Sequence, residues 1–334
     1  MVTVFDVARL AGVSSATVSR ALSGKPEVSP STRARVLSAV EAIGYKPNFN
    51  AQALRLGRSR TVGLVVGDIR QGGYAALTSS LQESLAAIGC SMLMFDMQHQ
   101  EERLSSFLDR TRSLGLAAIV IAMPHVMSAA TRNKIRTLSE TGLPTILQGQ
   151  TLAGDRMFSV RVDDREMAAK AVGYLARAGR TPIGYLGRVS DSAIGQDRFQ
   201  GYVAGIKANG LAFDPALVWD TGSGYRYAVG RQELARALDA GLRFRGVLAA
   251  SDELALGAMS IALDRRKAVP EEMAFVGFGA NPWAEYVRPS LTTVTTHPDE
   301  VGKVVAEIVG RSLDGKEGRR HYVLPGSLVV RESA

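Results

Sequence analysis

Residues 4–22 read Val-Phe-Asp-Val-Ala-Arg-Leu-Ala-Gly-Val-Ser-Ser-Ala-Thr-Val-Ser-Arg-Ala-Leu, and this stretch decides the fold of the first part of the chain. Thr3 and Asp6 form a capping box, which predicts a helix that starts near residue 4 and ends at Gly12. Ser14 is a second N-cap, and the apolar residues behind it repeat at helical spacing. The stretch therefore predicts two short helices that meet at a glycine-containing turn.

A third helix is expected next in the sequence. Ser29 is its N-cap, Pro30 occupies its first position, and Gly44 ends it. Three short helices within about 45 residues form either a helix-turn-helix or a generic helical bundle. In a helix-turn-helix, the second helix enters the major groove of DNA with its N-terminal residues at the base edges.

The distribution of charge favours the DNA-binding reading. The chain has 334 residues and a formal net charge of +8, which indicates an anionic partner such as a nucleic acid or a membrane surface. Residues 1–60 hold nine basic and three acidic side chains, a net +6, and the other 274 residues carry only +2. The basic character therefore belongs to the segment with the three predicted helices.

The sequence of this segment resembles that of a known family. Residues 4–22 and the continuation from Val28-Ser29-Pro30 to Gly44-Tyr45-Lys46-Pro47-Asn48 resemble the helix-turn-helix of the lactose-repressor/galactose-repressor (LacI/GalR) family of bacterial transcription factors. The resemblance implies that double-stranded operator DNA is the partner. It places base-reading residues at Ser15, Ala16 and Arg20, and backbone-contacting residues at Thr17, Ser19, Tyr45 and Asn50.

Arg20 is the residue best suited to read a base. Its guanidinium can donate two hydrogen bonds to O6 and N7 of guanine, whereas Ala16 can only touch a thymine methyl group. The alternative for Arg20 is a phosphate contact, because most protein–DNA hydrogen bonds do not reach bases.

Residues 48–57 follow as a possible hinge. They can form about two helical turns, too few to be stable alone in water. By resemblance this is the family's hinge helix, which folds on the operator, with Leu54 as a wedge in the minor groove and Arg55 beside it. The alternative is that Leu54 only anchors a linker to the core.

From Thr61 the chain alternates apolar strand-like runs with amphipathic helical stretches, which predicts parallel sheets covered by helices on both faces. Seven runs are expected to form strands, at residues 62–66, 92–95, 118–122, 144–147, 183–186, 246–249 and 275–278. The expected fold class is thus α/β, with an all-α helix-turn-helix and hinge helix before two parallel sheets. The resemblance persists at residues 178–187, 197–202, 250–258 and 289–294 and so covers essentially the whole chain. It implies a two-lobed core, similar to periplasmic binding proteins, with crossovers near residues 160–163, 290–292 and 322–323.

The expected domains follow from these boundaries. Residues 1–46 form the helix-turn-helix domain, 47–60 the hinge, and 61–334 the effector-binding and dimerisation core. The first lobe is expected at about 61–161 and 292–322, and the second at about 162–290 and 323–334.

Ligands of open α/β sheets bind beyond the carboxyl ends of the strands, so the cleft between two lobes is the expected effector site. Arg198 matches a family arginine that reaches the effector, and its alternative is a surface salt bridge. Tyr74 and Trp283 offer rings that can stack on a sugar or a nucleobase, although each can equally be a packing residue.

The remaining effector-site candidates lie at strand ends. Ser251 stands where the family often has Asn, and Asp252 after it can bind the effector or cap the next helix. Gly279 stands where the family commonly has an Asp that binds polar groups of the effector. The absence of this aspartate puts a typical hexose arrangement in doubt. An effector with its own negative charge, such as a sugar acid or a sugar phosphate, would lose less from it.

Other classes of protein find little support in the sequence. The four histidines are scattered, and the chain has no His-Glu-x-x-His, Gly-x-Ser-x-Gly, Walker or Gly-x-Gly-x-x-Gly pattern, so we expect no catalytic residue, metal or cofactor. The longest apolar run, 116–123, is far below the ~20 residues of a membrane span. With one cysteine, Cys90, and no leader-like start, a cytoplasmic protein is expected.

The sequence thus predicts a transcriptional repressor. We expect a homodimer, possibly of higher order, whose operator affinity depends on a small-molecule effector of the sugar, sugar-acid or sugar-phosphate class. A co-repressor or activator mode is the alternative, and a metabolite sensor that does not touch DNA is disfavoured by residues 1–60.

Overall fold

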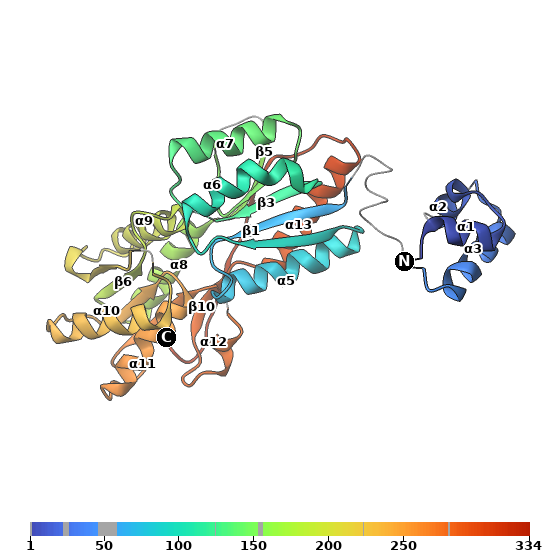
Figure 1. Ribbon diagram of the computed structural model, residues 1–334. Coiled ribbons are helices and arrows are strands. Elements are labelled where there is room, and N and C mark those ends of the chain that lie inside the picture. The colour runs from blue at the N-terminus through green and yellow to red at the C-terminus, as the bar shows by residue number, and fades with distance from the viewer. Residues whose placement is uncertain are drawn as a thin grey trace. The chain divides into compact units, whose positions relative to one another are not determined.

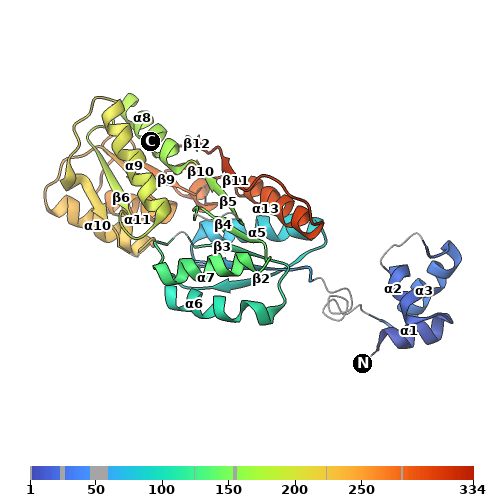
Figure 2. The same cartoon turned by 90° about the horizontal axis from the view of Figure 1, so that it is seen from above.

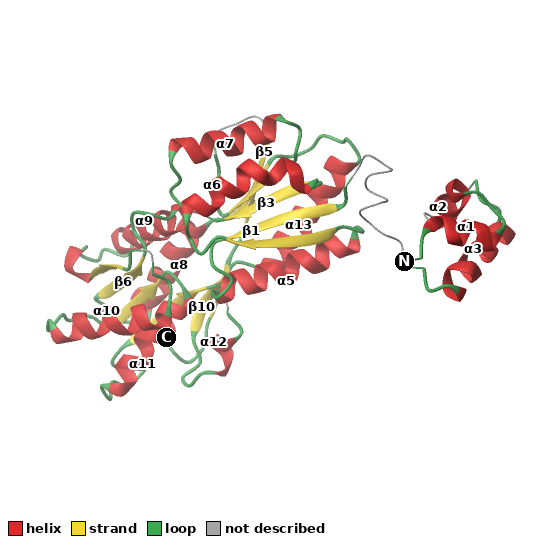
Figure 3. Ribbon diagram, viewed as in Figure 1, coloured by secondary structure: helices red, strands yellow, loops and turns green. Residues whose placement is uncertain are grey.

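The computed structural model describes residues 2–22, 27–45, 59–123, 125–152, 156–222, 224–279 and 281–334. The chain divides into two compact units, one ending at Ser59 and one beginning at Arg60 (Figures 1 and 3). Every helix within the described ranges is too short or too polar to span a bilayer.

The N-terminal unit consists of α1 (Val4–Ala11), α2 (Ser15–Leu22) and α3 (Pro30–Ala42). The backbone N–H of Thr3 donates to Asp6 Oδ2 at 2.9 Å, and Ser29 Oγ accepts from the N–H of Thr32 at 3.3 Å. All three helices contribute to one small apolar core, which contains Val7, Val18 and Val36. The predicted helix-turn-helix is therefore confirmed, including its N-caps.

The larger unit begins with the first lobe, which is built on a six-stranded sheet of order β11-β5-β4-β3-β1-β2. All its strands are parallel. They are β1 (Thr61–Val66), β2 (Ser91–Asp96), β3 (Ala118–Ala122), β4 (Thr145–Gln148), β5 (Met157–Val162) and β11 (His321–Leu324).

Helices cover both faces of this sheet. Leu64 and its neighbours on one face pack against α5 (Gly72–Ala87) and α13 (Pro298–Leu313). Ile119 and Ile121 on the other face pack against α6 (Glu101–Arg110) and α7 (Ala129–Glu140). Figure 2 shows the two helix pairs on opposite sides of the strands. This division follows from the alternation of side chains along a strand.

The second lobe has a six-stranded sheet of order β12-β10-β9-β8-β6-β7, in which only the β10–β12 pair is antiparallel. Its strands are β6 (Ile183–Gly187), β7 (Val218–Asp220), β8 (Gly246–Ala249), β9 (Ala274–Phe278), β10 (Thr292–Thr295) and β12 (Ser327–Val329). Its helices are α8 (Asp164–Arg177), α9 (Ala193–Ala208), α10 (Tyr227–Asp239), α11 (Asp252–Asp264) and the short α12 (Trp283–Tyr286). One apolar core holds this lobe together.

Two of the three expected crossovers need correction. The first runs from β5 to α8, within the expected region. The second was expected at 290–292, yet β10 pairs with β9 in the second sheet, so the chain changes lobes only between β10 and α13. The third follows β11, which pairs with β5 through Leu324. Residues 292–295 therefore belong to the second lobe, because their backbone hydrogen bonds are made there.

Candidate functional site

Two regions collect the residues that the sequence singles out, and the first is the surface of α2. Ser14 Oγ accepts from the N–H of Thr17 at 3.1 Å, and the two hydroxyls lie 2.9 Å apart, so Thr17 takes part in the cap of α2. Val18 and Ala21 turn into the core, which leaves Ala16 and Arg20 exposed one helical turn apart.

Arg20 makes no hydrogen bond or ion pair within the described parts of the chain, so its guanidinium is available to a partner. Ser15 and Ser19 are half-buried. Tyr45 is also half-buried, and it packs against the core of this unit. Asn50, Leu54 and Arg55 lie outside the described residues.

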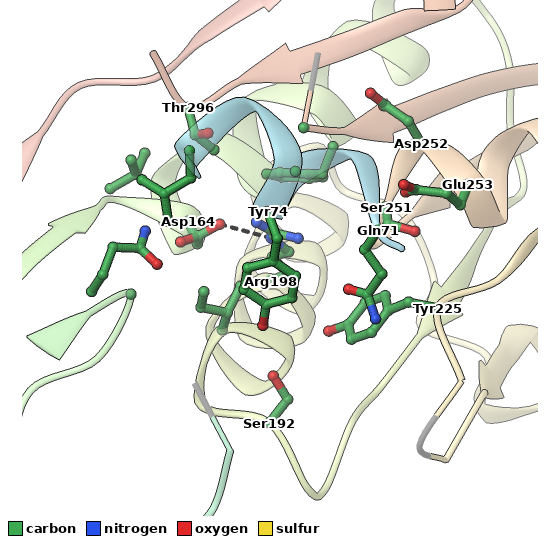
Figure 4. A pocket seen from close by; sticks show the side chains of 18 of the residues that line it. Gln71, Tyr74, Asp164, Ser192, Arg198, Tyr225, Ser251, Asp252, Glu253 and Thr296 are labelled. Carbon is green, nitrogen blue, oxygen red and sulfur yellow. Dashed lines mark hydrogen bonds and ion pairs between the residues drawn. The ribbon is translucent and has the colours of Figure 1, made fainter. Parts of the chain in front are cut away.

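The second region is a cavity of about 140 Å³ between the lobes, which we call the effector cavity (Figure 4). Its lining comes from segments that follow the carboxyl ends of strands in both sheets. From the first lobe these include Tyr74, His99 and Gln148, and from the second Arg198 and Ser251. Because the two sheets face each other with these ends, the effector cavity brings together residues as far apart in the sequence as Gln71 and Asn281.

Arg198 is held in the effector cavity by several contacts. Its Nε donates to Asp164 Oδ1 at 2.7 Å, its Nη1 donates to the carbonyl of Ala250 at 2.5 Å, and its guanidinium lies 4.3 Å from the centre of the Phe278 ring. The side chains of Arg198 and Asp164 are only 11% and 5% exposed. The surface salt bridge considered as an alternative is therefore wrong.

Asp252 is fully buried beside this pair. One of its carboxylate oxygens accepts from Thr293 Oγ1 at 2.5 Å, and the other accepts from the N–H of Asn281 at 2.6 Å. Burial raises its pKa to about 6, against the lowering effect of these hydrogen bonds. The N-cap of α11 is Ser251, whose Oγ accepts from the N–H of Leu254 at 3.2 Å. Asp252 is thus the first helical residue, and Ser251 makes the capping bond that had been considered for Asp252.

Gly279 has a φ of +129°, a backbone conformation that side chains of L-residues rarely adopt. A Cβ atom placed on it would lie 3.5 Å from Asp252 Oδ2. An aspartate here would therefore combine backbone strain with repulsion between two carboxylates. The neighbouring Asp252 supplies the carboxylate of this corner of the cavity.

Replacing Gly279 by alanine should lower the free energy of unfolding by about 1–3 kcal/mol, because the new side chain requires the strained conformation. Gly73→Ala is the matched control. Gly73 also lines the cavity, but it lies in the first turn of α5 with no atom within 4 Å of its Cβ position, so we expect no loss of stability. Urea unfolding of the two variants measures the difference, and equal stabilities would contradict the strain at Gly279.

Several lining residues were not anticipated from the sequence. Arg188 is 1% exposed, and its Nε donates to Asp191 Oδ1 at 2.6 Å. Its Nη2 lies 3.2 Å from Nδ1 of His125 on the first lobe. His99 stacks on His125 with ring centres 6.3 Å apart. Arg188 directly follows β6 and stands two residues after the strand expected at 183–186, so its place near a carboxyl strand end could have indicated it.

Gln71 completes this side of the cavity, with its Nε2 lying 2.7 Å from Nε2 of His99. Burial, and then the charges of Arg188 and His125, lower the pKa of His99 to about 4. His99 is therefore neutral near pH 7, and its Nε2 accepts the hydrogen bond from the Gln71 amide. The ring of Tyr74 lies 6.1 Å from that of His99, and burial raises the pKa of its hydroxyl.

Of the effector residues expected from the sequence, the structure brings together Tyr74, Arg198, Ser251, Asp252 and Gly279. Trp283 is not among them. It lies on α12 with 65% of its surface exposed and takes no part in the lining, so its expected place in the pocket is wrong. The chain leaves the cavity at Asn281, two residues before Trp283.

Direct contacts hold the two lobes together around the effector cavity. The N–H of Gly72 on the first lobe donates to Glu253 Oε1 on the second at 2.7 Å. On another side of the cavity, the N–H of Val126 donates to the carbonyl of Asp191 at 3.1 Å. Polar groups of one lobe thus satisfy polar groups of the other.

Comparisons with known proteins agree with both regions. Residues 3–48 match the family model "Bacterial regulatory proteins, lacI family", and residues 172–334 match "Periplasmic binding protein-like domain". The HTH-type transcriptional regulator GalR of Escherichia coli K12 is 33% identical over 294 residues, which cover 88% of this chain and 84% of GalR. AscG of the same organism, also an HTH-type transcriptional regulator, is 31% identical over 338 residues, which cover 100% of this chain and 98% of AscG.

A solved structure of similar fold is the transcriptional regulator CelR in complex with cellobiose. It has a TM-score of 0.74 and 26% sequence identity, and the match covers 100% of both chains. The likeness therefore includes the N-terminal unit as well as the two lobes.

Proposed function

Because this chain belongs to the LacI family of bacterial regulatory proteins, we propose that it is a repressor whose affinity for operator DNA is set by an effector in the cavity between its lobes. It is a DNA-binding transcriptional regulator. The observation that carries the proposal is the effector cavity, at which carboxyl strand ends of two lobes meet around Arg198 and Asp252, in a chain that also contains a helix-turn-helix.

On DNA, we propose that a homodimer places its two α2 helices in successive major grooves, about 34–36 Å apart, on a nearly palindromic site. Ser15, Ala16 and Arg20 are the proposed base-reading residues. Thr17, Ser19, Tyr45 and Asn50 are the proposed backbone contacts, while Leu54 and Arg55 are proposed to enter the minor groove. The exposure of Ala16 and Arg20 on one face of α2 supports this assignment.

Replacing Arg20 by alanine should relax the base preference at one position in each half-site, by about 1–3 kcal/mol of discrimination. The measurement is a binding assay on a library of operator variants, with Arg35→Ala as the control because Arg35 is an exposed arginine on α3. A uniform loss of affinity across all sequences would instead assign Arg20 to phosphate.

For the effector, we propose a sugar or a sugar acid that contacts Tyr74, Arg198, Ser251 and Asp252. Arg198 and Arg188 supply donors for acceptor oxygens of the ligand, and Asp252 supplies an acceptor for its hydroxyl groups. The cellobiose complex of CelR supports a carbohydrate ligand. Effector binding would change the contacts between the lobes, among them the bond from Gly72 to Glu253, and thereby the spacing of the two DNA-binding units.

A screen of thermal stability tests this proposal. Sugars, sugar acids and sugar phosphates are added to the full-length protein, because a ligand at 100 times its Kd stabilises the native state by about 2.7 kcal/mol. Each stabilising compound is then added to the protein–operator complex. Release of DNA supports the repressor with an inducer, whereas tighter DNA binding assigns the compound as a co-repressor.

A further inference from the structure

A second and wider cavity, of about 430 Å³, lies beside the effector cavity and shares His125 and Gly149 with it. We call it the outer chamber. It too lies between the lobes, with Arg132, Gln150 and Arg161 on the first lobe and Gln196 and Asp197 on the second. No residue expected from the sequence to bind DNA or effector lines it.

Two charged side chains in the outer chamber have no partner among the residues that the structure describes. Arg161 on β5 and Asp197 on α9 are both half-buried, and neither makes an ion pair or a hydrogen bond through its side chain with any described residue. Burial raises the pKa of Asp197, and the Arg161 charge opposes this only from a distance. Half-buried charged groups without partners are open to polar groups of a ligand, because a partner offsets the cost of their desolvation.

The neighbouring side chains add acceptors. Gln150 uses its Nε2 to donate to the carbonyl of Met123 at 2.8 Å, and Gln196 uses its Nε2 to donate to the carbonyl of Ser190 at 2.8 Å. Each amide therefore keeps its Oε1 as an acceptor. Arg132 donates through Nη1 to the carbonyl of Met127 and retains further N–H donors.

The outer chamber thus offers both donors and acceptors. A hydroxylated ring requires both, because each hydroxyl group donates as well as accepts. We propose that the outer chamber binds the second unit of a two-unit carbohydrate effector, either a disaccharide or a sugar linked to a sugar acid. Its first unit occupies the effector cavity, and the ligand passes His125 and Gly149. This inference rests on the proposed function of the effector cavity.

Calorimetric titration of the full-length protein tests the inference with two pairs of probes, glucose with cellobiose and gluconate with lactobionate. In each pair the second compound contains the first as one of its two units. We expect at least one two-unit probe to bind about tenfold more tightly than its one-unit partner, the gain that hydrogen bonds to charged groups provide. The inference is overturned if neither two-unit probe gains affinity or if none of the four compounds binds.

Variants test whether the higher affinity of the two-unit probe comes from contacts in the outer chamber. Arg161→Gln and Asp197→Asn should each remove most of the advantage of the two-unit probe and leave one-unit binding unchanged. Arg243→Gln is the control, because Arg243 is an exposed arginine that precedes β8 and so lies at the other end of the sheet. If a variant lowers the affinity for the one-unit and the two-unit probe of a pair equally, the inference is overturned.

The proposed function has a separate readout. Two-unit binding that depends on Arg161, without any change in operator affinity, would refute the effector role and leave the outer chamber as a carbohydrate site. Release of operator by a one-unit probe alone would support the effector role and overturn the outer chamber as part of it.

Discussion

Replacing Arg198 by methionine should lower the free energy of unfolding by about 3–5 kcal/mol and abolish effector binding. The destabilisation comes from Asp164, whose buried carboxylate loses the 2.7 Å bond to Arg198 and is left without its partner. The carbonyl of Ala250 loses a donor as well. Urea unfolding near pH 7 measures the change.

A double variant distinguishes two causes of the destabilisation, the unpaired carboxylate of Asp164 and the lost packing of Arg198. In Arg198→Met with Asp164→Asn, the buried negative charge is removed, so most of the stability should return. Effector binding should stay absent, because the donors of Arg198 are still missing. A cost below about 1 kcal/mol for Arg198→Met alone would contradict the buried pair and indicate a solvent-screened one.

Acidification should destabilise the wild-type protein more than a His99→Gln variant. Burial lowers the pKa of His99 from 6.5 to about 4 in the folded state. As the pH falls, the unfolded chain binds its proton first, so the contribution of the neutral imidazole is complete above pH 6.5 and is lost as the pH approaches 4. The pKa of His99 is lowered by about 2.5 units, from 6.5 to about 4, and at about 1.36 kcal/mol per unit the loss of stability is at most about 3.4 kcal/mol.

The comparison with the variant is necessary because other groups titrate in the same window. Burial also lowers the pKa of His125, which adds to the acid sensitivity. Asp252 acts in the opposite direction, since its raised pKa of about 6 makes the folded state bind a proton more readily than the unfolded chain. The unfolding free energies of the wild-type protein and the His99→Gln variant are measured between pH 7 and 4.5, and their difference gives the contribution of His99. If both free energies fall equally with pH, the lowered pKa of His99 is contradicted.

Strong local signals allowed much of the fold to be predicted. Thr3, Ser14 and Ser29 satisfy backbone N–H groups or fix side chains within a single turn, so their effect is readable without tertiary context. Seven apolar runs were predicted as strands, and all seven are strands. Strands such as β10, Thr-rich and four residues long, and β12, only three residues long, were not anticipated. Such short segments become strands only because a neighbouring strand accepts their hydrogen bonds.

The candidate site was predictable to a smaller degree. Arg198 and Asp252 were found through the resemblance, but the partner of Arg198 was not, since Asp164 begins a helix that looks ordinary in the sequence. Trp283 was misplaced because loop length after β9 does not reveal where the chain leaves the cavity. Arg188 and His125 meet across the lobe boundary, and no local pattern links two residues 63 positions apart.

The sequence by itself determined the helix-turn-helix, the change to alternating strands and helices at Thr61, and the concentration of positive charge in the first sixty residues. These depend on caps, periodicity and composition, which act over a few neighbouring positions. Tertiary structure decided to which lobe β10 belongs, how Asp252 and Gly279 share one corner of the effector cavity, and that Arg161 and Asp197 both line the outer chamber. These depend on hydrogen bonds, burial and charge between distant segments, which exist only once the two sheets have packed.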